Sequence, residues 1–581
     1  MIKLSDYVFQ FLKDKGIKDV FMLPGGGAMH LVDSLGYSGI NYTHFQHEQA
    51  ASIATEAYGQ HTNHLGVLLV TSGPGGTNAI TGVTAGWIDS TPMLILSGQA
   101  KRSDLVGNKG VRQIGSQEVQ IISMISPVVK YAVQVLDPYS IRYHLERAYF
   151  EATTGRKGPV WIDIPLDVQA TMLDANLLKG YNEPKLSDNT DYSSIAKDII
   201  SRLAASERPV ILAGNGIYSS GACNLFEEFE SHISIPVQTT WKALDLSYEE
   251  HPLFAGHPGL LGDRGANFII QRSDLFLSLG ARVDNSITAF NEKMFAPDAY
   301  KIIVDIDKNE LKKFSMNIDM AICADVRNVL EAINSELKDK RIEKNEWMQW
   351  CKSTRGKYPV VNSKHKQNAK YLSGYYFTDC LCEVLDDDDV IVPESAGVTV
   401  EATIQAFKSK RNQKNKHAAG LGSMGFGLPY AIGACIANGK HRTVLINGDG
   451  AFQLNIQELE TLRRLNLPIK IFIWNNCGYA SIRGMQRKNF GGHYVASNPE
   501  SGCTIPSISK IALAYDIPTT RIDKNDNLKE RIKQVLDTIG PVLCEVMIDP
   551  DEVVAPKVVS SIDENGKMIP GTLDNMWPYI E

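Results

Sequence analysis

Short apolar runs alternate with amphipathic segments along almost the whole chain of 581 residues. In the first segment Leu4, Tyr7, Val8, Phe11 and Leu12 recur at helical spacing, which predicts an N-terminal helix. The strand-like runs are rich in Val, Ile and Leu at consecutive positions: residues 67–70, 93–96, 160–164, 210–212, 275–279, 301–304, 390–392, 444–446 and 469–473. Runs that are apolar on both faces and are separated by helices are typical of parallel sheets covered by helices. The pattern therefore predicts an α/β fold of doubly wound parallel sheets.

Two polar stretches divide this pattern into three units. Residues 175–192 are rich in Asn and Asp, and residues 336–370 are rich in Lys, Glu and Asn. Because domains usually span about 100–200 residues, we expect three α/β domains, at residues 1–175, 190–338 and 370–555. The remaining tail, residues 556–581, carries Met, Trp and Tyr side chains and is expected to pack near the active site.

Composition and charge narrow the classes of function. Hydrophobic residues make up 43% and charged residues 22% of the chain, and the net charge is −7, which disfavours nucleic-acid binding as the main function. No apolar run reaches the roughly 18 residues of a membrane helix, and the N-terminus lacks the layout of a signal peptide. The nine cysteines form no Cys-x-x-Cys pair, which favours reduced thiols over disulfides or zinc. We therefore expect a cytoplasmic protein without a nucleic-acid or membrane partner.

The strongest chemical signal lies in the third unit. The apolar run 444–446 continues into Asn447-Gly448-Asp449-Gly450, and the run 469–473 leads to Asn475-Asn476. Turns that follow neighbouring parallel strands converge at the carboxyl edge of a sheet, where ligands of α/β proteins bind. Asp and Asn oxygens suit Mg²⁺, while glycines admit a phosphate close to the backbone. The spacing predicts a metal ion that clamps a diphosphate, although two unrelated turns would give the same residue types.

These motifs, and others in the same order, resemble the thiamin-diphosphate (ThDP) enzyme superfamily over the whole chain. The matching segments are Pro24-Gly25-Gly26, His47-Glu48-Gln49-Ala50-Ala51, the glycine-rich run 71–78, Asp89-Ser90-Thr91-Pro92, residues 155–160 and residues 420–429. Within the superfamily the chain is most similar to the large subunit of acetolactate (acetohydroxyacid) synthase. The resemblance implies a pyrimidine-binding first domain, a central domain and a pyrophosphate-binding last domain.

The resemblance also implies roles for individual residues. Glu48 would hydrogen-bond N1′ of the aminopyrimidine, and Met424 would lie beneath the bend of the cofactor. Asp449, Asn476 and the Gly478 carbonyl would bind the metal. Gln117 would position a substrate, and the backbone near Gly26 and Gly27 would steer the developing oxyanion. The other expected cofactor contacts are Ser72, Asn78, Thr399, Gly422, Gly448, Gly450, Ala451, Phe452, Tyr479 and Ala480.

Acetolactate synthases also bind FAD in the central domain, although their net reaction is not redox. The matching positions here are Arg156, Gly214, Arg282, Asp305 and Asp325. The acidic pair that commonly follows the second arginine motif reads Asp284-Asn285. Relatives use the same domain without flavin, structurally or for ADP. FAD is therefore expected, with a structural central domain as the alternative.

Three positions near the expected substrate pocket depart from the family. The usual Phe-Gln-Glu reads Ser116-Gln117-Glu118, and the usual Pro-Lys-Asp reads Pro165-Leu166-Asp167. Met485 stands where a tryptophan selects the second 2-keto acid. Two lost aromatic rings and one lost charge indicate a wider pocket that suits a bulkier acceptor.

The resemblance implies a ThDP- and Mg²⁺-dependent transferase that decarboxylates pyruvate, keeps the two-carbon unit as hydroxyethyl-ThDP and transfers it to a second 2-keto acid. It also implies a homodimer or homotetramer with active sites between subunits. One alternative is acetyl transfer to a keto-sugar nucleotide in branched-sugar biosynthesis, since the tail resembles enzymes of that kind. Others are a simple 2-keto-acid decarboxylase or lyase, a flavin oxidase, and a non-catalytic regulatory paralogue.

Overall fold

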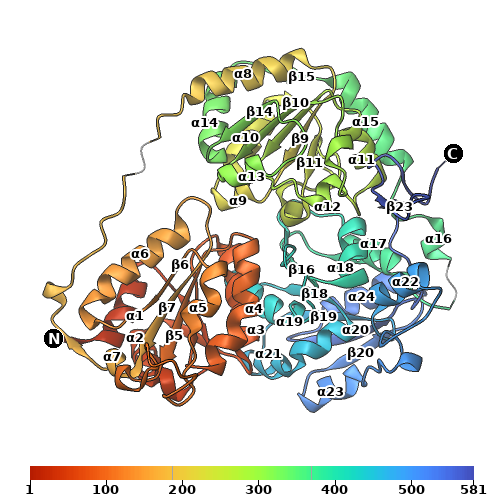
Figure 1. The fold of residues 1–581 in the computed structure, drawn as a ribbon. Coiled ribbons are helices and arrows are strands. Elements are labelled where there is room, and N and C mark those ends of the chain that lie inside the picture. Colours follow the sequence, from red (N-terminus) through yellow and green to blue (C-terminus); the bar gives the residue numbers. More distant parts are fainter. Residues whose placement is uncertain (186–187, 368–369, 581) are drawn as a thin grey trace.

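A computed structural model describes residues 1–185, 188–367 and 370–580, which form three lobes (Figure 1). Each lobe contains one larger sheet whose paired strands run parallel, with helices packed on both of its faces. The predicted α/β class with three parallel-sheet units is therefore confirmed.

The N-terminal lobe holds a six-stranded sheet between two layers of helices. Its strands lie in the order β3 (Asn41–His44), β2 (Asp19–Met22), β4 (Gly66–Val70), β5 (Met93–Gln99), β7 (Pro159–Pro165) and β6 (Tyr131–Gln134). Helices α1 (Leu4–Asp14), α2 (Met29–Ser38) and α6 (Ile141–Thr153) cover one face, and α3 (Glu48–Thr62), α4 (Pro74–Ile88) and α5 (Ile121–Ile125) the other. Val67 and Leu69 face the first layer and Leu68 and Val70 the second, so β4 is apolar at every position because both of its faces are buried.

The central lobe repeats this layered plan around five strands. Their order is β11 (Val237–Thr239), β9 (Pro209–Ala213), β12 (Leu275–Leu279), β13 (Tyr300–Asp305) and β14 (Met320–Cys323). Helices α8 (Tyr192–Ala205), α10 (Cys223–Ser231) and α14 (Val326–Leu337) pack on one face, and α11 (Arg264–Gln271), α12 (Asn285–Thr288) and α15 (Asn345–Lys357) on the other.

Helix α15 lies within the stretch that the sequence pattern presents as a connector. Trp347, Met348 and Cys351 of α15 are buried, and the Trp347 indole N–H donates to the Pro209 carbonyl at 2.9 Å. The central unit therefore extends past residue 338, because three apolar side chains among charged neighbours suffice to dock this helix. The earlier connector, at residues 175–192, contains a short 3₁₀ turn and irregular backbone. Residues 186–187 and 368–369 of the two stretches lie outside the described residues.

The C-terminal lobe has six strands and carries the glycine-rich turns at one edge of its sheet. The strand order is β17 (Lys414–Asn415), β16 (Val390–Pro393), β18 (Thr443–Gly448), β19 (Ile469–Asn475), β21 (Val542–Met547) and β20 (Thr519–Ile522). Helices α17 (Gly374–Val384), α18 (Gly397–Ala406) and α24 (Leu528–Leu536) cover one face, and α19 (Gly427–Ala437), α21 (Leu459–Leu465) and α23 (Ile508–Ala514) the other.

One hydrophobic core runs from the N-terminal lobe into the C-terminal lobe. It joins residues of α3 and α4 with residues of α19, which lies against α3. The approach is close, because a Cβ added at Gly433 of α19 would lie 2.3 Å from the carbonyl oxygen of Ala54 in α3. These two lobes therefore behave as one packed unit around α3.

A buried ion pair marks the point where all three lobes meet. Lys242 of the central lobe donates to Asp89, which caps the end of α4, at 2.9 Å. Asp89 also accepts the backbone N–H of Gly420 from the C-terminal lobe at 3.1 Å. One carboxylate thus ties together segments that are far apart in the sequence.

The tail packs on the central lobe. β22 (Lys557–Val558) pairs with β25 (Met576–Trp577), and Arg264 of α11 donates to the carbonyls of Met576, at 3.1 Å, and Pro578, at 2.6 Å. Val558, Leu573 and Met576 join the core beneath α11. The tail is thereby anchored, and its expected position near the active site stays a prediction.

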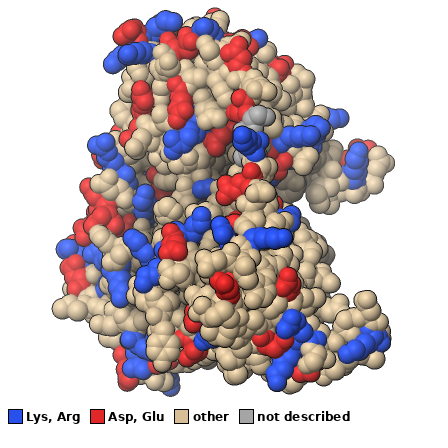
Figure 2. Space-filling view, turned by 90° about the vertical axis from the view of Figure 1, so that its left-hand side faces the viewer, with Lys and Arg blue, Asp and Glu red and all other residues tan. Residues whose placement is uncertain are grey.

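Acidic and basic side chains are interspersed over the face shown in Figure 2. Among the residues described, no helix is both long and apolar enough to cross a bilayer.

Candidate active site

The two polar turns of the C-terminal lobe meet as the spacing predicts. β18 and β19 are adjacent parallel strands, with Gly448 paired with Trp474, so Asp449 and Asn476 follow neighbouring strand ends. Both side chains are buried, with 1% and 5% of their surface exposed.

The Asp449 carboxylate is held by the backbone around it. Its two oxygens accept the N–H groups of Gly450, at 2.7 Å, and Gly478, at 3.1 Å. Burial raises the pKa of this carboxyl to about 6, although backbone N–H donors oppose the shift. A cation beside Asp449 would favour the ionised form, as metal ions do at carboxylate sites.

Asn476 supplies an oxygen without a partner. Its side-chain Oδ1 is buried and accepts no hydrogen bond within the described part of the chain. A buried polar atom left unpaired is costly unless a ligand satisfies it. Gly478 adopts φ of +126°, a conformation that favours glycine, and presents its carbonyl in the same loop. One carboxylate, one amide oxygen and one carbonyl form a hard donor set that fits Mg²⁺.

Arg483, which no sequence motif singles out, holds this loop in shape. It follows the loop in α22 (Ala480–Asn489), and the residue is only 5% exposed. It donates to four carbonyl oxygens, those of Asn476, Cys477, Ser497 and Pro550. A helical arginine carries no sequence signal for such a role, since most face solvent.

The other predicted cofactor residues of the C-terminal lobe lie around Asp449 and Asn476. The Gly450 Cα lies against the ring of Tyr479, and a Cβ there would lie 2.5 Å from Cε1. Thr399, in the first turn of α18, lies beside Gly448, whose added Cβ would be 3.0 Å from the Thr399 hydroxyl. Gly422 has φ of +62° and Met424 is half-buried. Ala451 and Phe452 are buried in the short helix α20 (Asp449–Phe452), and Ala480 begins α22.

In the N-terminal lobe Glu48 is the first residue of α3 and is 7% exposed. The side chain of Asn78 in α4 donates to Glu48 Oε2 at 3.0 Å. The structure therefore joins two of the predicted cofactor residues, and Asn78 fixes the rotamer of Glu48 from the adjacent helix.

Gly26 and Gly27 follow β2 and Ser72 follows β4, whereas Gln117 lies in the loop before α5, with its carbonyl oxygen against Gly73. The Gly27 N–H donates to Thr71 Oγ1 at 3.1 Å and its carbonyl accepts from Gln169 at 2.8 Å. A Cβ at Gly27 would lie 2.4 Å from the Ser72 hydroxyl, whereas one at Gly26 would meet nothing within 4 Å. Gly27 is thus engaged within the fold, and Gly26 is the glycine that faces open space.

The two groups of residues are linked within the chain through Asn455. Its side-chain amide donates to Gln49 Oε1 at 3.1 Å and to the Gly425 carbonyl at 2.7 Å. Gln49 follows Glu48, and Gly425 follows Met424. No hydrogen bond or ion pair among the described residues connects Glu48 directly with Asp449 or Asn476.

A second site lies between the lobes, in a cavity of about 680 Å³. Arg156, Arg282, Asp305 and Asp325 line it, together with the buried junction of Asp89 and Lys242. Gly214 directly follows β9, where a Cβ would be 2.3 Å from the Gly280 carbonyl oxygen, so it permits close packing of two strand ends.

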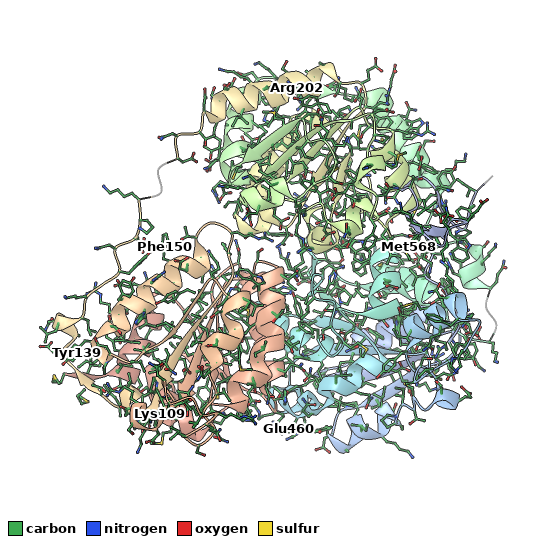
Figure 3. The ribbon with its side chains drawn as sticks, in the orientation of Figure 1. Lys109, Tyr139, Phe150, Arg202, Glu460 and Met568 are labelled. Carbon is green, nitrogen blue, oxygen red and sulfur yellow. The ribbon has the colours of Figure 1, made fainter. Side chains whose placement is uncertain are left out.

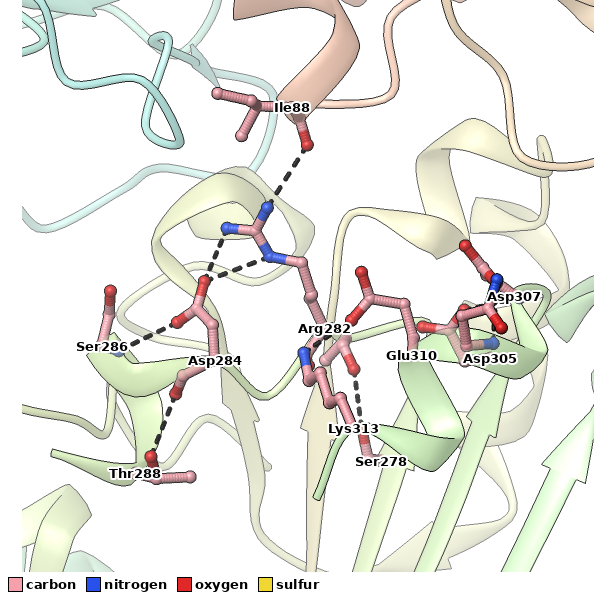
Figure 4. Close-up of polar contacts among 12 residues, drawn as sticks. Ile88, Ser278, Arg282, Asp284, Ser286, Thr288, Asp305, Asp307, Glu310 and Lys313 are labelled. Atoms are coloured by element: carbon pink, nitrogen blue, oxygen red, sulfur yellow. Dashed lines mark hydrogen bonds and ion pairs between the residues drawn. The ribbon is translucent and has the colours of Figure 1, made fainter. Parts of the chain in front are cut away.

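The two arginines of this cavity are paired with carboxylates, and Figure 4 shows the contacts of Arg282. Arg282 donates to Asp284 at 2.6 Å and to the Ile88 carbonyl at 3.3 Å, which joins the central lobe to α4. Arg156 contacts Asp307 at 3.0 Å and Glu310 at 2.7 Å. Burial raises the pKa of the Asp305 carboxyl to about 6.

Comparison with known proteins identifies the fold and its relatives. Three family models of thiamine pyrophosphate (ThDP) enzymes match the chain. They describe the N-terminal TPP-binding domain, at residues 2–124, the central domain, at residues 196–333, and the C-terminal TPP-binding domain, at residues 396–546. The chain is 32% identical to a probable acetolactate synthase large subunit of Methanocaldococcus jannaschii, over 95% of this chain and 93% of the relative. It is 32% identical to acetolactate synthase 1 of Zea mays, over 96% of this chain and 87% of the relative. It is 30% identical to the acetolactate synthase large subunit of Lactococcus lactis, over 96% of this chain and 94% of the relative.

A family match that covers almost the whole chain at this identity extends through all three lobes, including the turns that carry Asp449 and Asn476. The chain therefore belongs to the thiamine pyrophosphate enzymes, in the family of acetolactate synthase large subunits.

Proposed function

We propose that this chain is a ThDP-dependent carboligase of the acetolactate synthase type, with pyruvate as the donor and a second 2-keto acid as the acceptor. The observation that carries the proposal is the Asp449–Asn476 pair, with its unpartnered amide oxygen, in a family whose members bind ThDP. The full-length relatives named acetolactate synthase support the reaction class.

The residues divide the chemistry between them. When bound, ThDP supplies the carbon nucleophile and the electron sink. We assign Glu48 the task of holding a proton at Oε1, since Asn78 engages Oε2. We assign Asp449, Asn476 Oδ1 and the Gly478 carbonyl to Mg²⁺, and the open backbone at Gly26 to the developing oxyanion. Gln117, exposed in the loop between β5 and α5, is assigned to positioning a substrate.

We also infer a homo-oligomer in which these surfaces are covered. Large apolar side chains beside both halves of the site are exposed: Met29, Ile114 and Met124 in the N-terminal lobe, and Ile482, Met485 and Phe490 after the metal loop. Exposed apolar side chains gathered near a site are typical of interaction surfaces. A second copy would place one such surface against the other.

A keto-sugar nucleotide is the second candidate acceptor. Met485 is 51% exposed on α22, and Ser116 is exposed next to Gln117. Leu166 directly follows β7 and precedes Asp167, which is paired with Arg102 at 2.7 Å. These side chains give the approach to the site neither an aromatic wall nor a free lysine, which favours a wide acceptor.

The donor and acceptor can be identified with pyruvate as the only substrate. In an NMR time course with purified enzyme, ThDP and Mg²⁺, we expect acetolactate and CO₂ to form from pyruvate. Slow release of CO₂ or acetaldehyde without acetolactate would support the donor and redirect the acceptor to keto-sugar nucleotides. Unchanged pyruvate would contradict the donor assignment.

Replacement of Asn476 tests the metal site. We expect Asn476→Ala to weaken Mg²⁺ binding by at least about tenfold, because a ligand oxygen is lost, while Asn476→Asp retains an oxygen and binds the ion. Calorimetric titration of Mg²⁺ in the presence of ThDP measures the affinity. Asn309→Ala, on the exposed surface of the central lobe, is the matched control. Equal affinity of Asn476→Ala and the wild type would exclude this ligand.

The cavity between the lobes is proposed to hold FAD. Its volume of about 680 Å³ and its paired arginines suit a dinucleotide whose phosphates compete for Arg156 and Arg282. We expect the purified wild-type enzyme to show flavin absorbance. At the same protein concentration, the Arg282→Met variant is expected to hold at least about tenfold less bound flavin than the wild type. Arg202→Met, at an arginine that stacks on Tyr300 outside this cavity, serves as the control. A colourless wild-type enzyme that takes up no added FAD would contradict the assignment.

A further inference from the structure

A long loop of the N-terminal lobe, residues 106–118, ends at Gln117 and Glu118 and has no helix or strand of its own. Lys109 marks it at the lower edge of the lobe in Figure 3. Most side chains from residue 107 to residue 117 are exposed, whereas Glu118 is 5% exposed. Because such a loop has no backbone ladder of its own, it keeps one conformation only if side chains hydrogen-bond its backbone groups.

The Glu118 carboxylate is that partner. Oε1 accepts the N–H of Val106 at 2.6 Å, at the start of the loop. Oε2 accepts the N–H groups of Ile114, at 3.2 Å, and Gly115, at 3.0 Å, near its end. The two oxygens of one side chain therefore draw together segments eight or more residues apart, with charge-assisted bonds that are stronger than neutral ones.

Gln117, the residue before Glu118, has a backbone conformation that residues other than glycine rarely adopt. Gln117 has φ of +58°, and its carbonyl oxygen lies only 2.4 Å from where a Cβ at Gly73 would stand. Gly73 itself has φ of +61° and precedes α4, the helix that carries Asn78. A disfavoured conformation of this kind persists only where the surroundings hold it on more than one side.

A second anchor follows immediately. The side-chain amide of Gln99 donates to the Val119 carbonyl at 3.0 Å and to the buried Asp163 carboxylate at 3.2 Å. Gln99 and Asp163 lie on the adjacent strands β5 and β7. The exposed Gln117 thus lies between Gly115, whose N–H is held by the Glu118 carboxylate, and Val119, whose carbonyl is held to the sheet by Gln99. The three hydrogen bonds that the Glu118 carboxylate accepts within the loop are called the clamp below.

We propose that Glu118 is a positioning residue for the carboligation reaction: by closing residues 106–118 upon themselves, its carboxylate holds Gln117 in the left-handed conformation that directs it to the substrate. The proposal rests on the role of Gln117 in the proposed function. It also accounts for a buried carboxylate whose three bonds go to its own loop rather than to a cation.

Glu118→Gln tests the clamp with almost no change of volume. An amide keeps one acceptor oxygen, so it can hold either Val106 or the pair Ile114 and Gly115, but not both ends. We expect hydrogen exchange of the amides at these three residues to rise at least about tenfold in enzyme without added cofactor. We expect kcat for pyruvate to fall by about 10- to 100-fold, with KM and ThDP affinity changed by less than about threefold. Glu118→Asp, which keeps both oxygens, is expected to recover part of each loss.

The comparison with Gln117→Ala separates positioning from general stability. If Glu118 acts through Gln117, the double variant Gln117→Ala/Glu118→Gln is no slower than Gln117→Ala alone. Asp274→Asn is the matched control, since Asp274 accepts the N–H groups of Glu207 and Arg208 in a distant turn, and its kcat is expected to equal that of the wild type.

Three results would overturn the proposal: unchanged amide exchange in Glu118→Gln, faster exchange with kcat within twofold of the wild type, or additive losses in the double variant. Failure of the proposed function is distinct, because then the wild-type enzyme itself leaves pyruvate unchanged.

Discussion

The placement of α3 is the constraint on which the rest of the structure depends. This alanine-rich helix is buried along most of its length between α4 and α19. A glycine on each side allows the contact: a Cβ at Gly82 of α4 would lie 2.2 Å from the Ser52 hydroxyl, and one at Gly433 of α19 would lie 2.3 Å from the Ala54 carbonyl. Since interiors are packed at crystal-like density, neither neighbour can shift without displacing the first residue of α3, which is Glu48. Packing between two lobes thereby fixes a carboxylate of the site.

Around this frame, buried charged side chains hold backbone segments that carry the proposed chemistry. Arg483 donates to the carbonyls of the loop with Asn476 and Gly478, and Glu118 accepts N–H groups of the loop with Gln117. The Arg483 guanidinium and the Glu118 carboxylate thus form their hydrogen bonds with backbone groups. The atoms left without a partner, above all Asn476 Oδ1, are then the ones available to a ligand. The same logic removes Gly27 from the list of free groups, since both its N–H and its carbonyl are used.

Much of this arrangement could be predicted from the sequence because it follows from strand order. Asp449 and Asn476 meet because both follow adjacent parallel strands, and consecutive apolar residues such as 67–70 indicate strands buried on both faces. Other features depend on contacts between distant segments, which carry no local signal. Helix α15 docks with three apolar side chains in a charged stretch, and Lys242 reaches Asp89 from 153 residues away. The bonds of Arg483 and Glu118 likewise become visible only when the loops are folded.

The central claim is that Glu48 moves the proton that activates the bound cofactor. The most direct measurement is pyruvate turnover by Glu48→Gln at saturating ThDP and Mg²⁺, beside Glu346→Gln, an exposed glutamate of the central lobe. The account predicts that Glu48→Gln binds ThDP but turns over about 10²- to 10⁴-fold more slowly, because general acid–base catalysis is lost, while Glu346→Gln keeps the wild-type rate. A Glu48→Gln enzyme with ThDP bound and a rate within twofold of the wild type would contradict it.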